Sequence, residues 1–348
     1  MPRIAAPTAL AAIAASAAIA AAEPAPPVGL RPNVVFTQAT PLSSNPELAR
    51  RMLTPLTAAT IPRALAKLGK ALSEQPVDVT REHFVLYAPA KAPPGGYGLL
   101  VFVPPWREAR LPQGWAAGLD RHGMIFVSAA ESGNDASPLG RRDPLALIGA
   151  EGAMRLYPVD PEKVYVGGFS GGSRIAMRLA LAYPDVFRGA LLNAGGDPIG
   201  ESRAPIPPAD LFARFQSSRL VYVTGEKDTA NLAADGGSRE SMRQWCVYDV
   251  TSQVIPLVGH IEPDASAFGR ALDALTAPAR PDAAKLAACR AHIEKDLGAR
   301  LGRVEAQIAA GRPADARRLL EATDRRYGGL AAPRSLELAE RIRNAGGG

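Results

Sequence analysis

Between residues 83 and 275, short apolar runs bounded by Gly and Pro alternate with segments that repeat apolar residues at helical spacing. The runs are rich in Val, Ile, Phe and Tyr, which predicts β-strands. They cover residues 83–89, 98–105, 124–130, 163–168, 188–196, 219–225 and 250–259. Helices are predicted at residues 143–158, 172–184, 238–248 and 264–275. Because several strands are apolar on both faces, the pattern predicts an α/β fold with a mostly parallel central sheet and helices on both faces.

The strand pattern is missing from both ends of the chain. A helical pattern lies within residues 46–75, and residues 282–348 read as three helices divided by Gly and Pro breaks. These three helices predict a C-terminal helical appendage. We therefore expect four segments along the chain. They are a signal peptide at 1–22, a Pro-rich linker and helical segment at 23–80, the α/β domain at 81–280 and a helical extension at 281–348.

The first 22 residues place an apolar Ala, Ile and Leu run after an early Arg, with small residues at Ala20 and Ala22. This layout predicts a secretory signal peptide cleaved after Ala22. A membrane anchor is the alternative, although the run is short for a span. No later segment is apolar and long enough to cross a membrane. We expect a periplasmic or secreted protein with no integral span after cleavage.

The chain has two cysteines, Cys246 and Cys289. Disulfides persist in oxidising compartments, so export predicts a bridge between the two. Two cysteines do not make a convincing zinc site.

The net charge is +6, and the basic excess lies mostly in the C-terminal residues, where it is interleaved with acids. That pattern is typical of a solvated helix surface rather than a nucleic-acid patch, and export also argues against nucleic acid. The same helices could instead contact a protein or envelope partner.

The sequence Gly168-Phe169-Ser170-Gly171-Gly172 lies between a predicted strand and a predicted helix. It fits G-x-S-x-G, which in this context predicts a nucleophile elbow that projects the serine hydroxyl above the sheet. Gly168 and Gly172 would leave room where strand and helix backbones crowd together. A glycine-rich turn with an incidental serine is the alternative. The phosphate-loop patterns GxxxxGK[ST] and GxGxxG are absent from the stretch.

A serine hydroxyl needs a base before it attacks a carbonyl, and in this arrangement an acid and then a histidine follow at later strand ends. Of the four histidines, only His260 follows a late strand; the others are His83, His122 and His292. Asp228 lies just after the strand at 219–225. Glu226 is its nearest rival, and Asp235 and Asp249 fit the strand-end rule less well.

Two backbone N–H groups are expected to stabilise the oxyanion of an acyl-transfer reaction. Gly171, at the helix start, is the first candidate. The second should follow the strand at 98–105, where Pro104 and Pro105 have no N–H to donate. Trp106 is the first residue there that can donate.

Together these residues resemble the α/β-hydrolase superfamily, and residues 83–275 are most similar to secreted polyhydroxybutyrate depolymerases and feruloyl esterases. The resemblance rests on the stretch from Tyr157 to Gly196, on "VTGEKDTAN" and on "LVGH". The chain departs from these enzymes at the oxyanion loop, where they commonly carry "HGC". The resemblance implies a serine esterase that needs no metal or organic cofactor and acts on a small-molecule or oligomeric ester.

In that mechanism Ser170 attacks the ester carbonyl while His260 acts as general base, and water then releases the acyl group. Two other functions remain open from the sequence. One is a serine peptidase of the prolyl-oligopeptidase type, although no propeller repeat is visible. The other is a non-catalytic exported binding protein that keeps the hydrolase shell.

Overall fold

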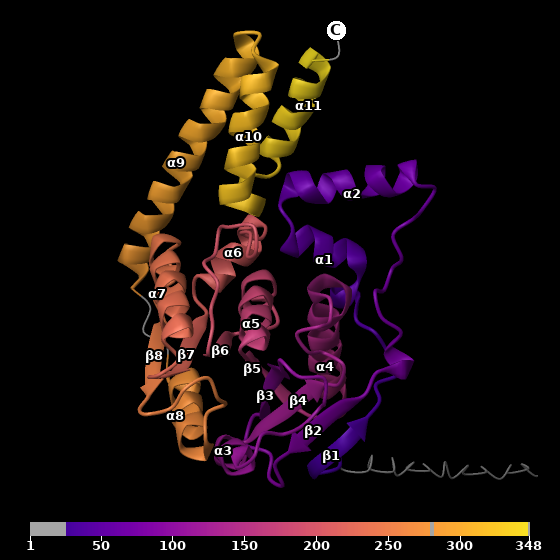
Figure 1. Cartoon of the computed structure of the whole chain (residues 1–348), viewed down its shortest axis with the longest axis vertical. Helices are drawn as coiled ribbons and strands as arrows, with labels where there is room; N and C mark the ends of the chain where they lie inside the picture. Colours follow the sequence, from indigo (N-terminus) through magenta and orange to yellow (C-terminus); the bar gives the residue numbers. More distant parts are fainter. Residues whose placement is uncertain (1–25, 279–281, 347–348) are drawn as a thin grey trace, which may run out of the picture.

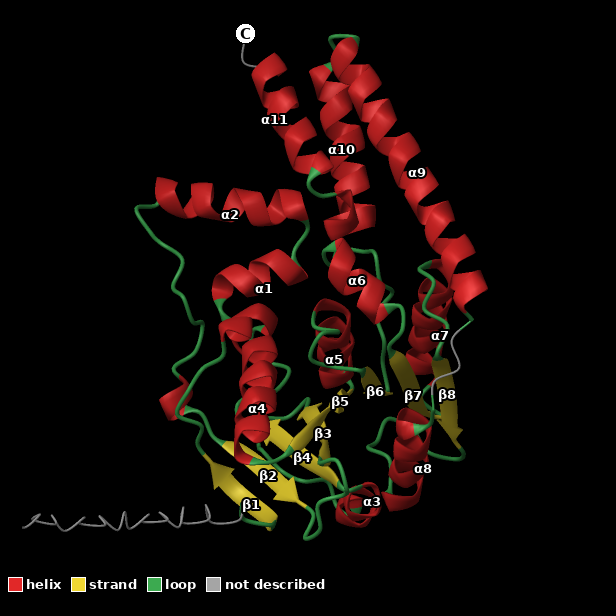
Figure 2. Ribbon diagram, turned by 180° about the vertical axis from the view of Figure 1, so that it is seen from behind, coloured by secondary structure: helices red, strands yellow, loops and turns green. Residues whose placement is uncertain are grey.

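The computed structural model describes residues 26–278 and 282–346, and Figures 1 and 2 show its arrangement from opposite sides. The predicted signal peptide at 1–22 lies outside the described residues. The strands are β1 (Gly29–Val34), β2 (Phe84–Ala88), β3 (Tyr97–Val103), β4 (Met124–Ala129), β5 (Val159–Phe169), β6 (Gly189–Asn193), β7 (Arg219–Gly225) and β8 (Val250–Ile255).

The helices divide into those that flank the sheet and those that project from it. The first group comprises α1 (Asn45–Met52), α3 (Trp115–His122), α4 (Asp143–Leu156), α5 (Gly171–Ala182), α6 (Ala209–Phe215), α7 (Thr229–Gln244) and α8 (Ala265–Thr276). The second comprises α9 (Ala283–Ala309), α10 (Pro313–Tyr327) and α11 (Arg334–Gly346), against which α2 (Pro55–Lys67) packs.

All eight strands form one sheet in the order β1-β2-β4-β3-β5-β6-β7-β8. Strand β2 is antiparallel to both of its neighbours, and strands β3 to β8 all run parallel to one another. This topology is that of the α/β-hydrolase fold and confirms the predicted fold class.

Side chains alternate between the two faces of the buried central strands, as a pleated sheet requires. In β3, Leu99, Val101 and Val103 join one hydrophobic cluster, while Leu100 and Phe102 join another. The first cluster is covered by α4, α5, α6 and the end of α7, and the second by α3 and α8. Both faces are therefore buried, which explains why the central strands read as nearly continuous apolar runs.

Three elements of this core were not predicted. Residues 29–34, assigned to a linker, form β1, which pairs antiparallel with β2 and bulges between Arg31 and Val34. Helix α3 packs its buried Trp115 ring against Phe268 of α8, with ring centroids 3.8 Å apart. Helix α6, the third, supplies buried apolar residues to the first cluster. The α/β unit thus begins upstream of residue 81.

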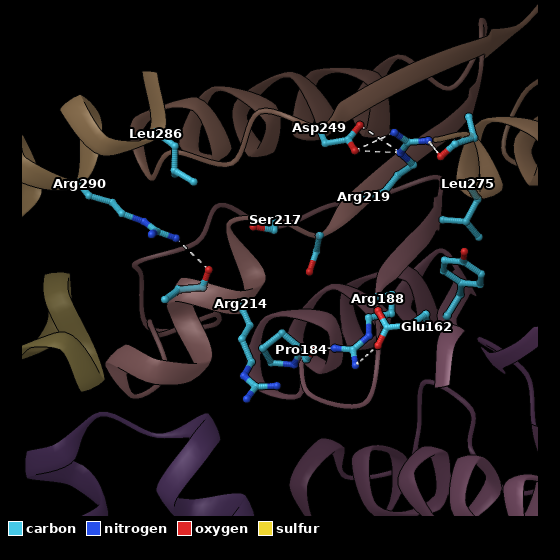
Figure 3. Close-up of a pocket in the computed structure, with 14 residues that line it drawn as sticks. Glu162, Pro184, Arg188, Arg214, Ser217, Arg219, Asp249, Leu275, Leu286 and Arg290 are labelled. Atoms are coloured by element: carbon cyan, nitrogen blue, oxygen red, sulfur yellow. Dashed lines mark hydrogen bonds and ion pairs between the residues drawn. The ribbon is translucent and has the colours of Figure 1, made fainter. Parts of the chain in front are cut away.

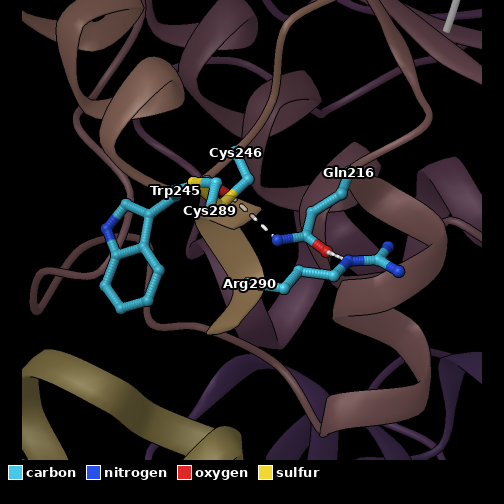
Figure 4. The surroundings of a disulfide bond; sticks show 5 residues. All are labelled: Gln216, Trp245, Cys246, Cys289 and Arg290. Atoms are coloured by element: carbon cyan, nitrogen blue, oxygen red, sulfur yellow. Dashed lines mark hydrogen bonds between the residues drawn. A yellow bond between two sulfur atoms is a disulfide. The ribbon is translucent and has the colours of Figure 1, made fainter. Parts of the chain in front are cut away.

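The C-terminal helices were predicted, and they project away from the sheet (Figure 1). They enclose a small apolar cluster of their own, which includes Val304, Leu320 and Leu338. The predicted disulfide is present: Cys246, just after α7, is bonded to Cys289 in α9 (Figure 4). Trp245 beside it is buried in the core. None of the helices within the described residues is long and apolar enough to cross a membrane.

Candidate active site

Ser170 sits at the turn from β5 into α5 with φ 56° and ψ −120°. A positive φ is strained for a residue with a side chain, and such strain is common at active sites. The turn depends on glycine, as predicted: a Cβ on Gly168 would overlap the backbone of Gly172, and one on Gly172 would overlap the carbonyl oxygen of Val103. The backbone around Ser170 therefore adopts the strained strand-to-helix turn that a nucleophile elbow requires, at the carboxyl edge of the sheet.

The structure brings the predicted serine, histidine and aspartate together. His260 Nε2 lies 2.8 Å from Ser170 Oγ, and His260 Nδ1 lies 2.6 Å from Asp228 Oδ2. Ser170 comes from the elbow, Asp228 directly precedes α7 and His260 lies in the loop between β8 and α8. Three segments far apart in sequence thus supply a continuous hydrogen-bonded series from hydroxyl to imidazole to carboxylate.

Asp228 is nearly inaccessible, with 8% of its surface exposed. Burial alone would raise its pKa, but hydrogen bonds from His260 and from the Asn231 amide outweigh this and hold the pKa below its ordinary value. Asp228 is therefore ionised at neutral and mildly acidic pH. An ionised carboxylate at this position orients the imidazole and stabilises its protonated form.

Two residues that the sequence analysis did not single out support this series. Asn231 Nδ2 lies 2.9 Å from Asp228 Oδ2 and 3.1 Å from His260 Nδ1. The Arg174 guanidinium donates to Asn231 Oδ1 at 3.2 Å and lies 3.4 Å from Asp197. Asn231 is one helical turn after Asp228, and that spacing is the only sequence signal that could have identified it.

The two predicted oxyanion donors lie on adjoining backbone segments. Gly171 is the first residue of α5, where an N–H group has no intrahelical acceptor. Within the described part of the chain, no backbone hydrogen bond engages the Trp106 N–H. The loop before Trp106 is fixed by two bonds: Arg142 Nη2 donates to Pro104 O at 2.9 Å, and Asn134 N–H donates to Pro105 O at 3.0 Å. Arg142 is buried, so it anchors this loop.

Asn134 also reaches the elbow with its side chain. A Cβ on Gly171 would overlap the Asn134 carboxamide. The exposed amide of Asn134 therefore lies over the first turn of α5, beside Ser170. Nothing in the local sequence marks Asn134, because the contact depends on how the loop after β4 folds over the elbow.

The surroundings of His260 are apolar and open. The Phe169 ring packs on the imidazole with centroids 4.8 Å apart, and the Trp106 ring lies 6.1 Å from Phe169. The His260 side chain keeps 42% of its surface exposed. Leu257 in the same loop is 75% exposed, held at φ 64° with its N–H bonded to Glu226. A substrate can approach this surface directly.

The rival acids have other partners. Glu226 accepts the Leu257 N–H, and Asp249 pairs with Arg219. Asp235 is buried against Thr224, and its burial raises its pKa to about 6. Of the other histidines, His122 at the end of α3 contacts Asp273 of α8. Among residues 26–278 and 282–346, no group of three or more His, Cys, Asp or Glu side chains is arranged to hold a metal ion.

Comparisons with known proteins agree with the fold. No family model matches the chain. A poly(3-hydroxybutyrate) depolymerase of Ralstonia pickettii is 29% identical over 98 residues, which cover 24% of this chain and 20% of that enzyme. The match therefore spans about a fifth of the depolymerase.

Two solved structures illustrate the structural likeness. A ferulic acid esterase is 16% identical, with a TM-score of 0.42 over 55% of this chain and 89% of that one. An S-formylglutathione hydrolase from Staphylococcus aureus is 10% identical, with a TM-score of 0.44 over 56% of this chain and 91% of that one. At these values neither structure carries an argument about function.

Proposed function

We propose that this chain is an exported serine esterase that cleaves carboxylic esters through an acyl-enzyme intermediate. The observation that carries the proposal is the series from Ser170 Oγ through the His260 imidazole to the Asp228 carboxylate, with separations of 2.8 and 2.6 Å. The first distance suits proton transfer from Ser170 to His260, and the second suits a carboxylate that orients the imidazole and stabilises the imidazolium. The strained elbow, which holds the hydroxyl at the carboxyl edge of the sheet, also supports it.

In the proposed reaction, His260 Nε2 takes the proton of Ser170 as Oγ attacks the ester carbonyl carbon. The N–H groups of Gly171 and Trp106 donate to the oxyanion as the tetrahedral intermediate forms. His260 then gives its proton to the departing alkoxide, and the alcohol leaves. Water, deprotonated by His260, attacks the acyl-enzyme; collapse of the second intermediate returns the proton to Ser170 and releases the carboxylic acid.

The substrate class follows from the surface around His260 and from the curated relative. The open rim with exposed Leu257 suits an ester with apolar groups. The matched segment of a polyester depolymerase supports an ester of a hydroxy acid, either a small molecule or an oligomer. Export is supported by the predicted signal peptide and the disulfide, since disulfides persist outside the cytoplasm.

The test is labelling of the purified protein with a fluorophosphonate probe, together with hydrolysis of p-nitrophenyl esters of increasing acyl length. We expect both activities in the wild type, neither in Ser170→Ala, and both in Ser202→Ala, which changes an exposed serine outside the site. Labelling with turnover of peptide amides but not of esters would favour a peptidase. A folded wild type that neither reacts with the probe nor hydrolyses the substrates would favour a non-catalytic binding protein.

A further inference from the structure

A cavity with a volume of about 660 Å³ lies at the opposite edge of the sheet from Ser170, and Figure 3 shows its lining residues. Arg188 and Arg219 line it where β6 and β7 begin. Helix α6 contributes Arg214, and α9 contributes Leu286 and Arg290. The cavity is therefore formed jointly by the amino ends of two strands and the first turns of the C-terminal appendage.

The lining of this cavity is positively charged. It contains four arginines against two acids, Glu162 and Asp249, which leaves a surplus of two positive charges. Arg219 is fully engaged, because it pairs with Asp249 and donates to three carbonyl oxygens of the chain around α8. Arg219 therefore holds the wall together, and the capacity to bind an anion rests on the other three arginines.

These three arginines have donors to spare. Arg188 donates from Nη1 to the Pro184 carbonyl and from Nη2 to Glu162, which leaves the second N–H of each nitrogen. Among the described residues, no side-chain hydrogen bond or ion pair involves the exposed Arg214 guanidinium. Arg290 uses Nε and Nη2 on Gln216 and the Ala213 carbonyl, which leaves Nη1. Guanidinium groups with unused N–H donors match the acceptor geometry of a carboxylate or phosphate.

Apolar side chains also line the cavity, among them Pro184, Leu275 and Leu286, together with the hydroxyl groups of Ser217 and Ser218. A cavity of this size that combines apolar side chains with guanidinium donors is typical of a small-molecule site. From its charge, free donors and apolar wall, we infer that this cavity binds a small organic anion, with a carboxylate or phosphate group against the arginines and an apolar body against Leu275 and Leu286.

The appendage completes the site. Cys289 adjoins Arg290, so the bond to Cys246 fixes this turn of α9 over the cavity (Figure 4). Arg290 adds its own bonds to Gln216 and Ala213. The site requires a docked α9 but none of the residues around Ser170, so the inference stands apart from the proposed esterase activity.

The test is calorimetric titration of the disulfide-bonded protein with hexanoate and with hexylphosphonate, using 1-hexanol as the uncharged control. We expect saturable binding of at least one anion, weakened by salt, and none of 1-hexanol. Arg188→Gln combined with Arg214→Gln should weaken binding about ten-fold or more. The matched control Arg325→Gln changes an exposed arginine of α10 and should bind as the wild type does. The stronger of the two anions identifies the preferred head group.

Because Arg188 is partly buried, Arg214→Gln alone provides a second variant at an exposed position, and its affinity should fall between those of the wild type and the double variant. Equal affinity in the wild type, Arg214→Gln and the folded double variant would overturn the inference, as would binding of 1-hexanol as tightly as the anions, or no binding of either anion at millimolar concentration. Ser170→Ala should keep anion binding while losing probe labelling, which separates this site from the proposed catalytic one.

Discussion

The carboxyl edge of the sheet, at Ser170, and the amino edge, at the arginine-lined cavity, differ in how their hydrogen-bond donors and acceptors are paired. Helix α7 runs from the first edge to the second. At its amino end, Asp228, Asn231, His260 and Ser170 are linked to one another by hydrogen bonds. Beyond its carboxyl end, around the disulfide, the cavity has more donors than acceptors. The first edge is preorganised by backbone and needs no further group. The second edge depends on the docked appendage, because α9 supplies Leu286 and Arg290 to it.

The largest effect is expected where backbone fits against backbone at the elbow. Gly172→Ala should give no soluble active protein, because the new Cβ overlaps the carbonyl oxygen of Val103 in β3. Gly171→Ala is the matched control, since its Cβ meets only the Asn134 side chain, which can rotate away. Soluble yield and circular dichroism measure both. A well-folded Gly172→Ala protein would show that the elbow is less constrained than the structure indicates.

Asp228→Asn should alter chemistry at the first edge while sparing the second. The amide cannot hold the imidazole in the required tautomer, so we expect kcat for esters to fall by about 10⁴-fold. Steady-state kinetics on p-nitrophenyl esters measure the loss, and Asp249→Asn at the far edge serves as the activity control. Comparable activity in Asp228→Asn and the wild type would remove Asp228 from the proposed mechanism.

Replacing Cys246 and Cys289 together by serine should destabilise the second edge while sparing the chemistry of the first. The bridge closes a loop with a sequence separation of 43 residues, so loop-closure entropy predicts a loss of about 4 kcal/mol in the free energy of unfolding. Urea denaturation at pH 7 measures it. Ester hydrolysis below the melting temperature should persist, because the proposed catalytic residues lie at the other end of α7. A selective loss of activity in the folded double variant would show that the two edges are coupled.

The stability contributed by Asp235, within α7, and by Asp228, just before it, should depend on pH in opposite directions. Burial raises the pKa of the Asp235 carboxyl in the folded protein to about 6 and so favours its protonated form. The stability that this group contributes is therefore fully present below its unfolded pKa and is lost as the pH rises through about 6. Asp235→Asn should therefore stabilise the protein at pH 8, by up to roughly 3 kcal/mol, and hardly at pH 4. Denaturation at both pH values measures this. An equal gain at both would mean that the Asp235 carboxyl is not titrating.

The pH dependence of Asp228 has the opposite sign. Its folded pKa is lowered, so the stability it contributes is present above the unfolded pKa and is lost as pH falls through the folded value.

The sequence predicted the sheet core well because its central strands are buried on both faces and read as apolar runs. It missed β1, which lies at the edge, contains Pro32 and is largely exposed, so that no apolar pattern marks it. It also missed α3, whose eight residues depend on tertiary packing of Trp115 against α8. Short elements that are stabilised by distant contacts leave a weak local signal.

The candidate site shows the same division. Ser170, Asp228 and His260 could be chosen because chain order and strand ends restrict where such residues can lie. Asn134 and Arg174 could not, because their contacts arise only once the chain is folded, and Asn231 was marked only by its spacing after Asp228. The arginine cavity was also invisible, since its residues come from separate segments that meet only at the amino ends of the strands.

Strand β1 affects whether the sheets of two copies of this chain can pair edge to edge. It forms one free edge of an eight-stranded sheet, and an unprotected edge can pair with a strand of another molecule and start aggregation. Pro32 removes one N–H from that edge, and the bulge between Arg31 and Val34 interrupts its regular ladder. The first strand of the described chain therefore also keeps the sheet from extending into a neighbouring copy.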